Sequence, residues 1–216
     1  MKKLIIITSI LCVTSLPAWS QIRFDIKAGM SFSSSPSTAN ILVNRSNPHE
    51  EFQMNMIKVK PQFYGGIAVN VGLSSPFFLE GGVSYTKRTS TYMVEYRMPP
   101  EIGPATQYMD ESENMILLPV NVGVSIGKVD ITSGLTASRT ISTIKQLTHL
   151  KGFHQDANGI KLGWQMGARF AVKRAMIGVE YQASLSRVGQ GMYVNGQSLE
   201  LMNLPGQFVF GIQYKL

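Results

Sequence analysis

The segment 22–33, with the sequence IRFDIKAGMSFS, carries charged side chains at three alternate positions, Arg23, Asp25 and Lys27. The other alternate positions are all apolar, namely Ile22, Phe24, Ile26, Ala28, Met30 and Phe32. Because successive side chains of a β-strand point to opposite faces, this pattern predicts a strand with one charged face and one unbroken apolar face. A row of neighbouring opposite charges can form structural ion pairs or line a path for ions.

Other alternating segments of the chain carry charges that the same alternation places on the polar side. The candidate lumen charges are Arg23, Asp25, Lys27, Glu80, Arg169, Glu180 and Lys215. One interpretation is an ion path or gate, and the other is a structural network in which each buried charge is kept because its partner is present. We expect the structural network, in which removal of one partner from a dry site costs about 3–5 kcal/mol.

Catalysis would need a nucleophile and a base within hydrogen-bond reach, usually a serine with a histidine. The three histidines, His49, His149 and His154, fall in polar segments between the alternating ones. HEE at 49–51 and THLKGFHQD at 148–156 hold residue types that could bind a metal or exchange a proton. We expect solvated histidines and no catalytic, cofactor or metal site. The alternative is a hydrolase or acyltransferase that acts on envelope lipid.

The alternation of the first segment recurs seven more times. The further segments are 62–73, 77–90, 116–127, 129–140, 160–172, 177–186 and 207–216. In each of them, bulky apolar residues alternate with small, amide or charged residues, and 129–140 is the weakest because Ser133 interrupts its apolar face. Eight such segments predict an all-β protein with eight strands.

Long and short connections alternate between these segments. Polar stretches at about 34–60, 95–113, 142–159 and 187–205 follow the first, third, fifth and seventh strands, and only SSP, GK and KRA follow the others. Short turns at one rim and long loops at the other are typical of outer-membrane barrels. We therefore predict a closed eight-stranded antiparallel up-and-down transmembrane β-barrel, with its termini in the periplasm and its long loops outside the cell.

Alternation alone does not say which face is inside, and a soluble lipocalin-type barrel is the structural alternative. A water-facing wall should be rich in Lys and Glu, but charged residues make up only 15% of the chain. Small side chains suit the narrow lumen of an eight-stranded barrel. Aromatic residues that could mark the two membrane interfaces are Phe24, Phe77, Phe170 and Tyr214 near the turns and Phe32, Phe63, Tyr85 and Tyr181 near the loops.

Residues 1–20 have the features of a bacterial secretory signal, with two lysines, an apolar run and small residues before a predicted cleavage at Gln21. The expected mature domain, 21–216, has no cysteine, because the single Cys12 lies in the signal. A lipoprotein signal is the alternative, but the small residue it needs before the cysteine is missing. Without the two lysines the formal charge falls from +7 to +5, and the scattered cations argue against nucleic-acid binding.

The predicted loops carry groups that suit contacts outside the membrane. DESEN at 110–114 is acidic and KQLTHLKGFH at 145–154 is basic, so they could meet across the outer rim or touch lipopolysaccharide. Met54 and Met56 could give an adhesive surface, or belong to a strand that continues above the membrane. The expected partners are outer-membrane lipids, lipopolysaccharide and an envelope or surface protein, and the expected state is a monomer.

The segment 113–127, ENMILLPVNVGVSIG, places a proline inside the fourth predicted strand. Together with the signal peptide and the eight alternating segments, it resembles the outer-membrane β-barrel proteins of Bacteroidota, the PorT-like group, over essentially the whole mature chain. The resemblance implies an eight-stranded outer-membrane barrel and says little about activity; PorT itself is associated with protein secretion, but no residue of this sequence singles out that role. Leu216 departs from the terminal phenylalanine of proteobacterial barrels. We expect a structural or interactive role, because eight strands leave no room for a general diffusion channel.

Overall fold

The structure is a computed structural model that describes residues 22–33, 40–42, 51–97, 105–144, 153–155, 159–186, 192–194, 197–198 and 206–216. The predicted signal peptide, His49, His149 and nearly all of 145–154 lie outside these residues, as does the side chain of His154. Within the described residues there is no helix long and apolar enough to cross a membrane.

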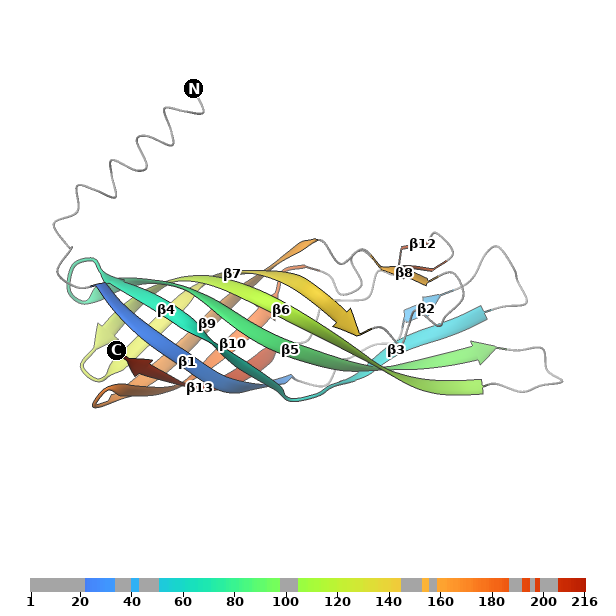
Figure 1. The fold of residues 1–216 in the computed structure, drawn as a ribbon, viewed down its shortest axis with the longest axis horizontal. Helices are drawn as coiled ribbons and strands as arrows, with labels where there is room; N and C mark the ends of the chain where they lie inside the picture. Colours follow the sequence, from blue (N-terminus) through green and yellow to red (C-terminus); the bar gives the residue numbers. More distant parts are fainter. Residues whose placement is uncertain are drawn as a thin grey trace, which may run out of the picture.

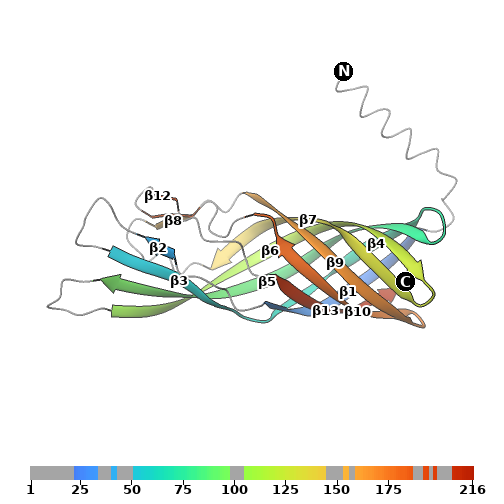
Figure 2. The same ribbon diagram turned by 180° about the vertical axis from the view of Figure 1, so that it is seen from behind.

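Eight strands form a closed ring. They are β1 (Ile22–Ser33), β4 (Gln62–Gly72), β5 (Phe77–Arg97), β6 (Ala105–Ile126), β7 (Val129–Ile144), β9 (Ile160–Val172), β10 (Ala175–Ser184) and β13 (Gln207–Lys215). Each pairs antiparallel with its neighbours in this order, and β13 pairs with β1. Figure 1 and Figure 2 show the strands inclined around one long axis. The predicted eight-stranded antiparallel barrel is confirmed.

The seam between β1 and β13 closes the wall. It begins with Asp25 opposite Lys215, and the backbone N–H of Leu216 donates to the carbonyl oxygen of Phe24 at 3.0 Å. In hydrocarbon, an open strand edge would leave N–H and C=O groups unpaired, at several kcal/mol for each group. Closure pairs the edges of the first and last strands with each other.

Three short turns, 73–76, 127–128 and 173–174, join strands at one end of the barrel. Gly127 and Lys173 have φ angles of 64° and 55°, the left-handed conformation that tight hairpin turns require. The C-terminus lies at this end in Figure 1, and Ile22 lies opposite Val71, next to the first turn. The structure therefore places the start of β1, the end of β13 and the short turns at one rim, as predicted from the connection lengths.

The strands continue beyond the barrel at the opposite end, where we predicted loops. β5 extends to Arg97 and β6 starts at Ala105, so most of the predicted loop 95–113 is strand. β3 (Glu51–Val59) pairs with this part of β5, and β2 (Asn40–Leu42) pairs with β3, inside the predicted loop 34–60. A separate small sheet contains β8 (Phe153–Gln155), β11 (Met192–Val194) and β12 (Gln197–Ser198). Figure 1 shows β3, β5 and β6 extending together beyond the barrel.

These loop predictions were wrong because they relied on where the apolar alternation stops. Strands outside hydrocarbon need no apolar face, and polar side chains pair across the extension. The Thr91 hydroxyl donates to the Asp110 carboxylate at 2.7 Å, for example. Met56 is a buried residue of β3, packed at the level of Tyr92 in β5. It therefore belongs to a strand that continues above the barrel, which was the alternative to an adhesive loop.

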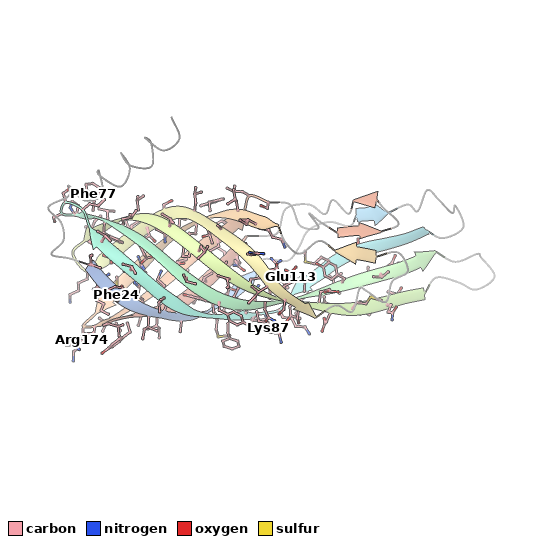
Figure 3. The ribbon with its side chains drawn as sticks, turned by 45° about the horizontal axis from the view of Figure 1, so that its top comes forward. Phe24, Phe77, Lys87, Glu113 and Arg174 are labelled. Carbon is pink, nitrogen blue, oxygen red and sulfur yellow. The ribbon has the colours of Figure 1, made fainter. Side chains whose placement is uncertain are left out.

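The two faces of the barrel wall meet different surroundings. Apolar residues of the outer face are exposed, for example Phe63 at 70% and Leu135 at 61%, whereas Asp25 and Glu80 on the inner face are at 1% and 0%. Exposed aromatic residues lie at both ends of this apolar band, and Figure 3 shows Phe24 and Phe77 near the turns. An apolar exterior around a charged interior is the reverse of a lipocalin-type barrel, so that alternative is wrong.

Pro119 interrupts the ladder between β5 and β6. Pairing stops at Gly81 opposite Val120 and resumes at Ser84 opposite Leu117. Proline has no N–H, so it cannot donate to β5. The proline of the motif that resembles the PorT-like group therefore leaves a short gap in an otherwise continuous wall.

An arginine in the middle of the apolar band should destabilise the barrel in a bilayer. For Leu135→Arg we expect a loss of about 2–4 kcal/mol in the free energy of unfolding, because the guanidinium would sit in hydrocarbon. The measurement is urea unfolding of the protein in lipid vesicles. Gln107→Arg, on the exposed part of β6 beyond the barrel, is the matched control and should change little. Equal effects of the two substitutions would contradict a lipid-facing band.

Candidate functional site in the barrel lumen

Glycines on the inner wall make room for large side chains in the lumen. The Tyr64 ring of β4 lies across Gly29 of β1 and Gly211 of β13, and a Cβ atom on either glycine would clash with it. At the turn end, the Phe78 ring occupies the place that a Cβ of Gly123 would need. The lumen of this barrel is therefore filled by side chains and is not an open pore.

The Asp25 carboxylate is one centre of the polar filling. It accepts hydrogen bonds from Arg23 Nε at 3.0 Å, from Asn70 Nδ2 at 2.7 Å and from Gln213 Nε2. The three donors come from β1, β4 and β13, so the group ties together the strands of the closing seam. Asp25 itself stands opposite Lys215 of the last strand.

The Glu80 carboxylate is the second centre and is completely buried. One of its oxygens accepts hydrogen bonds from Lys27 Nζ at 2.7 Å and from Asn121 Nδ2 at 3.0 Å. The other accepts from Arg169 Nη1. Arg169 also donates to Gln213, which reaches the Asp25 group. Two cations and an amide from three further strands therefore converge on one carboxylate in the middle of the lumen.

Two of the predicted residues stay outside this network. Glu180 is a diagonal neighbour of Arg169, because Gly178 pairs with Arg169 and Glu180 with Gly167. Lys215 stands opposite Asp25 in the seam. Neither forms a hydrogen bond or an ion pair with any side chain that the structure describes. The structure thus brings together Arg23, Asp25, Lys27, Glu80 and Arg169, and leaves Glu180 and Lys215 as neighbours without a direct bond.

A chain of amide side chains around the inner wall was not anticipated. Gln62 donates to Gln207 (3.5 Å), Gln207 to Gln182 (2.8 Å), Gln182 to Gln165 (3.4 Å), Gln165 to Asn121 (2.9 Å) and Asn121 to Glu80 (3.0 Å). Each amide donates to the next residue of the chain, and the last one donates to the Glu80 carboxylate. Hydrogen bonds in such a chain polarise one another. The inward position of each amide was visible in the sequence, but their order depends on the strand register.

A second ion cluster lies nearer the protruding strands. The Glu113 carboxylate pairs with Arg88 and, at 3.7 Å, with Lys161 Nζ. The sequence placed Glu113 in a loop, so this cluster was missed, although Arg88 and Lys161 stood on the inward side of their segments. The acidic segment 110–114 meets cations of the barrel strands here, whereas its predicted basic partner, 145–154, lies almost entirely outside the described residues.

Asp110 forms a third pair, on the protruding part of the strands. Its carboxylate accepts hydrogen bonds from Lys60 Nζ at 2.6 Å and from the Thr91 hydroxyl at 2.7 Å. These hydrogen bonds, first that of Lys60 and then that of Thr91, lower the pKa of Asp110 below its usual value of 3.8.

Between the Glu80 and Glu113 groups lies a space of about 650 Å³ that is partly open to solvent. One side is lined by Gln62, Gln182 and Gln207, and the opposite side by Met115 and Leu117. Within the described part of the chain, no group of three or more His, Cys, Asp or Glu side chains could hold a metal ion. The polar contacts that the structure shows at this site are ion pairs and amide hydrogen bonds.

A closed ring of eight antiparallel strands with an apolar outer band and a polar, filled lumen defines the fold of the small outer-membrane β-barrels. The structure is similar to the outer membrane protein OprG from Pseudomonas aeruginosa, with a TM-score of 0.50 and 12% identity over 90% of this chain and 95% of that one. It is also similar to the outer membrane protein Ail of Yersinia pestis, with a TM-score of 0.44 and 12% identity over 91% and 100% of the chains. No protein-family model and no curated protein matches the sequence.

Replacement of Glu80 tests the ion network. We expect Glu80→Gln to lower the free energy of unfolding by about 3–5 kcal/mol, because Lys27 and Arg169 would then be buried without a counter-charge. Glu180→Gln removes a lumen carboxylate without an ion pair and is the matched control, with an expected change near zero. Urea unfolding in the same vesicles measures both. A small loss for Glu80→Gln would show that water enters the site and screens its charges.

The Asp110 pair should give a pH-dependent contribution to stability. Since folding lowers the pKa of Asp110, its contribution is fully present above the unfolded pKa of 3.8 and is lost as the pH falls through the folded pKa. At pH 7 the carboxylate should stabilise the protein by less than about 1 kcal/mol, because the pair is partly exposed. The difference in unfolding free energy between the native chain and Asp110→Asn should disappear at strongly acid pH. A difference that persists there would have another origin.

Proposed function

We propose that this chain is an integral protein of the bacterial outer membrane and serves as an anchored interaction module. The observation that carries the proposal is the closed wall with an exposed apolar band around a lumen crossed by the Glu80 ion network. A closed wall leaves no strand edge unpaired in lipid, and an outward apolar band is what hydrocarbon would cover. The proposal includes a monomeric barrel, since the closed ring needs no strand from a second copy.

The filled lumen supports a role other than that of a general channel. Lys27, Arg169 and Asn121 meet at Glu80 from different strands, so the cross-section is occupied at this level. Solute flux would require these ion pairs to separate inside the barrel, which leaves buried charges uncompensated. We therefore assign the barrel an anchoring role.

The protruding strands support the interactive part of the proposal. β5 and β6 carry the hydrogen-bonded wall beyond the apolar band, and β3 widens it. A rigid sheet outside the bilayer can present side chains to a partner at low cost in conformational entropy. The partner would be another envelope or surface component. A link to protein secretion is a finer proposal that rests only on the resemblance to the PorT-like group.

In the proposed orientation, the short turns lie in the periplasm and the protruding strands lie outside the cell. The sequence-based alternative, an enzyme that modifies envelope lipid, depended on His49, His149 and His154, whose side chains lie outside the described residues. The ion pairs and amides of the lumen offer no support for such chemistry, and we propose no catalytic role.

Cysteine labelling in intact cells tests location and orientation together. Gln107→Cys places a thiol on the protruding part of β6, and Lys128→Cys places one in the turn 127–128; both positions are exposed. A membrane-impermeant maleimide should label Gln107→Cys in intact cells and Lys128→Cys only after the outer membrane is opened. The reverse pattern would overturn the orientation, and absence of the chain from the outer-membrane fraction would overturn the proposal.

A further inference from the structure

Some described cations of this barrel have an ion pair and others have none, and Lys60, which pairs with Asp110, is a paired cation on the protruding part. In the lumen, Lys27 and Arg169 pair with Glu80, and Arg88 with Glu113. Lys58, Lys87 and Arg139 on the outer face are exposed and have no ion pair with any side chain that the structure describes. A buried cation needs a counter-charge within the protein, whereas an outward cation can take one from its surroundings.

The outward cations lie at the border of the apolar band, on the side of the protruding strands. Lys87 follows the exposed Tyr85 in the outward row of β5, and it stands opposite Asn114 of β6. Arg139 stands opposite Ile116 of β6, so the two cations flank that strand. Figure 3 shows Lys87 well away from Phe24, Phe77 and Arg174 at the turn end. This is the level at which lipid headgroups meet a barrel wall.

Two β-bulges occur next to this border, and each turns an additional side chain outwards. In β3 the register shifts between Met56 and Lys58, and both Ile57 and Lys58 are exposed. In β7 the register also shifts, because Asn114 of β6 pairs with Ser142 while the next residue, Met115, pairs with Thr140. Ile141 is the additional residue, and both Ile141 and Ser142 are exposed. Bulges of this kind re-aim side chains. Without its bulge, Lys58 would have pointed inwards.

Between the cations lies a row of hydrogen-bonded polar groups. The Tyr85 hydroxyl donates to Asn114 Oδ1 at 2.8 Å, and Asn114 Nδ2 donates to the Ser142 hydroxyl at 2.6 Å. This row runs from β5 across β6 to β7 on the exposed face. It holds amide and hydroxyl groups in fixed positions beside Lys87 and Arg139, where they can bond a hydroxylated ligand.

The extent of the patch indicates which ligand it fits. The strands that bear Lys58, Lys87 and Arg139 cover three inter-strand spacings, which is roughly 14 Å. Lys58, opposite Thr91, also lies further from the apolar band than Lys87 does. The phosphate of a single phospholipid would meet only one of these cations. A glycolipid headgroup with phosphates on a sugar backbone extends both sideways and away from the membrane, and its sugars offer hydroxyl groups.

We propose that Lys58, Lys87 and Arg139, with Asn114 and Ser142, form a binding site for the phosphorylated sugar headgroup of lipopolysaccharide. The proposal rests on the proposed location and orientation, which put this face in the outer leaflet. Ile57 and Ile141 border the site and contact the acyl chains or the base of the headgroup. The cations at the other rim, Lys128, Lys173 and Arg174, sit in separate turns and face the opposite leaflet.

The test compares two triple variants of the full chain. The first combines Lys58→Gln, Lys87→Gln and Arg139→Gln, and the matched control combines Lys128→Gln, Lys173→Gln and Arg174→Gln. Each protein is folded into vesicles of zwitterionic phospholipid alone, with an anionic phospholipid, or with lipopolysaccharide. Native mass spectrometry measures retained lipid, and the heat-dependent gel shift checks folding.

We expect the native chain and the turn control to retain lipopolysaccharide in preference to anionic phospholipid. The first triple variant should retain it more than about tenfold less, since each cation near an anionic lipid surface contributes about 1 kcal/mol. Lys87→Arg keeps the charge and should behave as the native chain, while Lys87→Gln alone should show a partial loss.

Three results would overturn the site. The first is that the two triple variants retain lipopolysaccharide equally. The second is that the native chain retains anionic phospholipid as well as it retains lipopolysaccharide. The third is that Lys87→Arg loses as much lipopolysaccharide as Lys87→Gln does. If the first triple variant does not fold, the two substitutions of Lys87 decide the question. Because binding is measured in vesicles, failure here is distinguishable from failure of the proposed location, which the labelling of Gln107→Cys in cells measures separately.

Discussion

The need to pair every backbone N–H and C=O group in hydrocarbon is the constraint on which this structure depends. It requires β13 to return to β1, and the seam carries a continuous ladder from Asp25 opposite Lys215 onwards. It also fixes which residues face lipid, because a shift of the register by one residue would turn every side chain of a strand to the other face. Pro119 is the visible exception, and the ladder between β5 and β6 is interrupted next to it.

Closure creates a narrow interior, and the interior then decides which charges can remain. Glu80 is fully buried and can be ionised there because Lys27 and Arg169 reach it from other strands. The amide chain that ends on the same carboxylate adds hydrogen bonds without adding charge. A lumen filled in this way gives the wall internal support, so the proposed function lies on the parts of the barrel that face outwards.

Beyond the apolar band the constraint on the backbone is relaxed, because water can satisfy unpaired groups. The strands nevertheless continue, held by polar pairs such as Lys60 with Asp110. Irregular pairing becomes tolerable here, and both bulges fall near this border. The same change of solvent explains why Lys58, Lys87 and Arg139 can stand on the outer face without an ion pair to any described side chain.

The period-two alternation of the sequence by itself determined the eight strands of the wall and the sharing of one face by Arg23, Asp25 and Lys27, because both follow from side chains alternating along a single strand. Residue types, with small and amide side chains on the polar face and few charges in the chain, then indicated which face is inside. Only the tertiary structure decided that Glu80 meets Lys27 and Arg169, that Glu180 has no ion pair with a described side chain, and that Glu113 belongs to a strand. Such contacts depend on the register and stagger between strands, which hydrogen bonds across the whole ring set together. No single segment of the sequence contains that information.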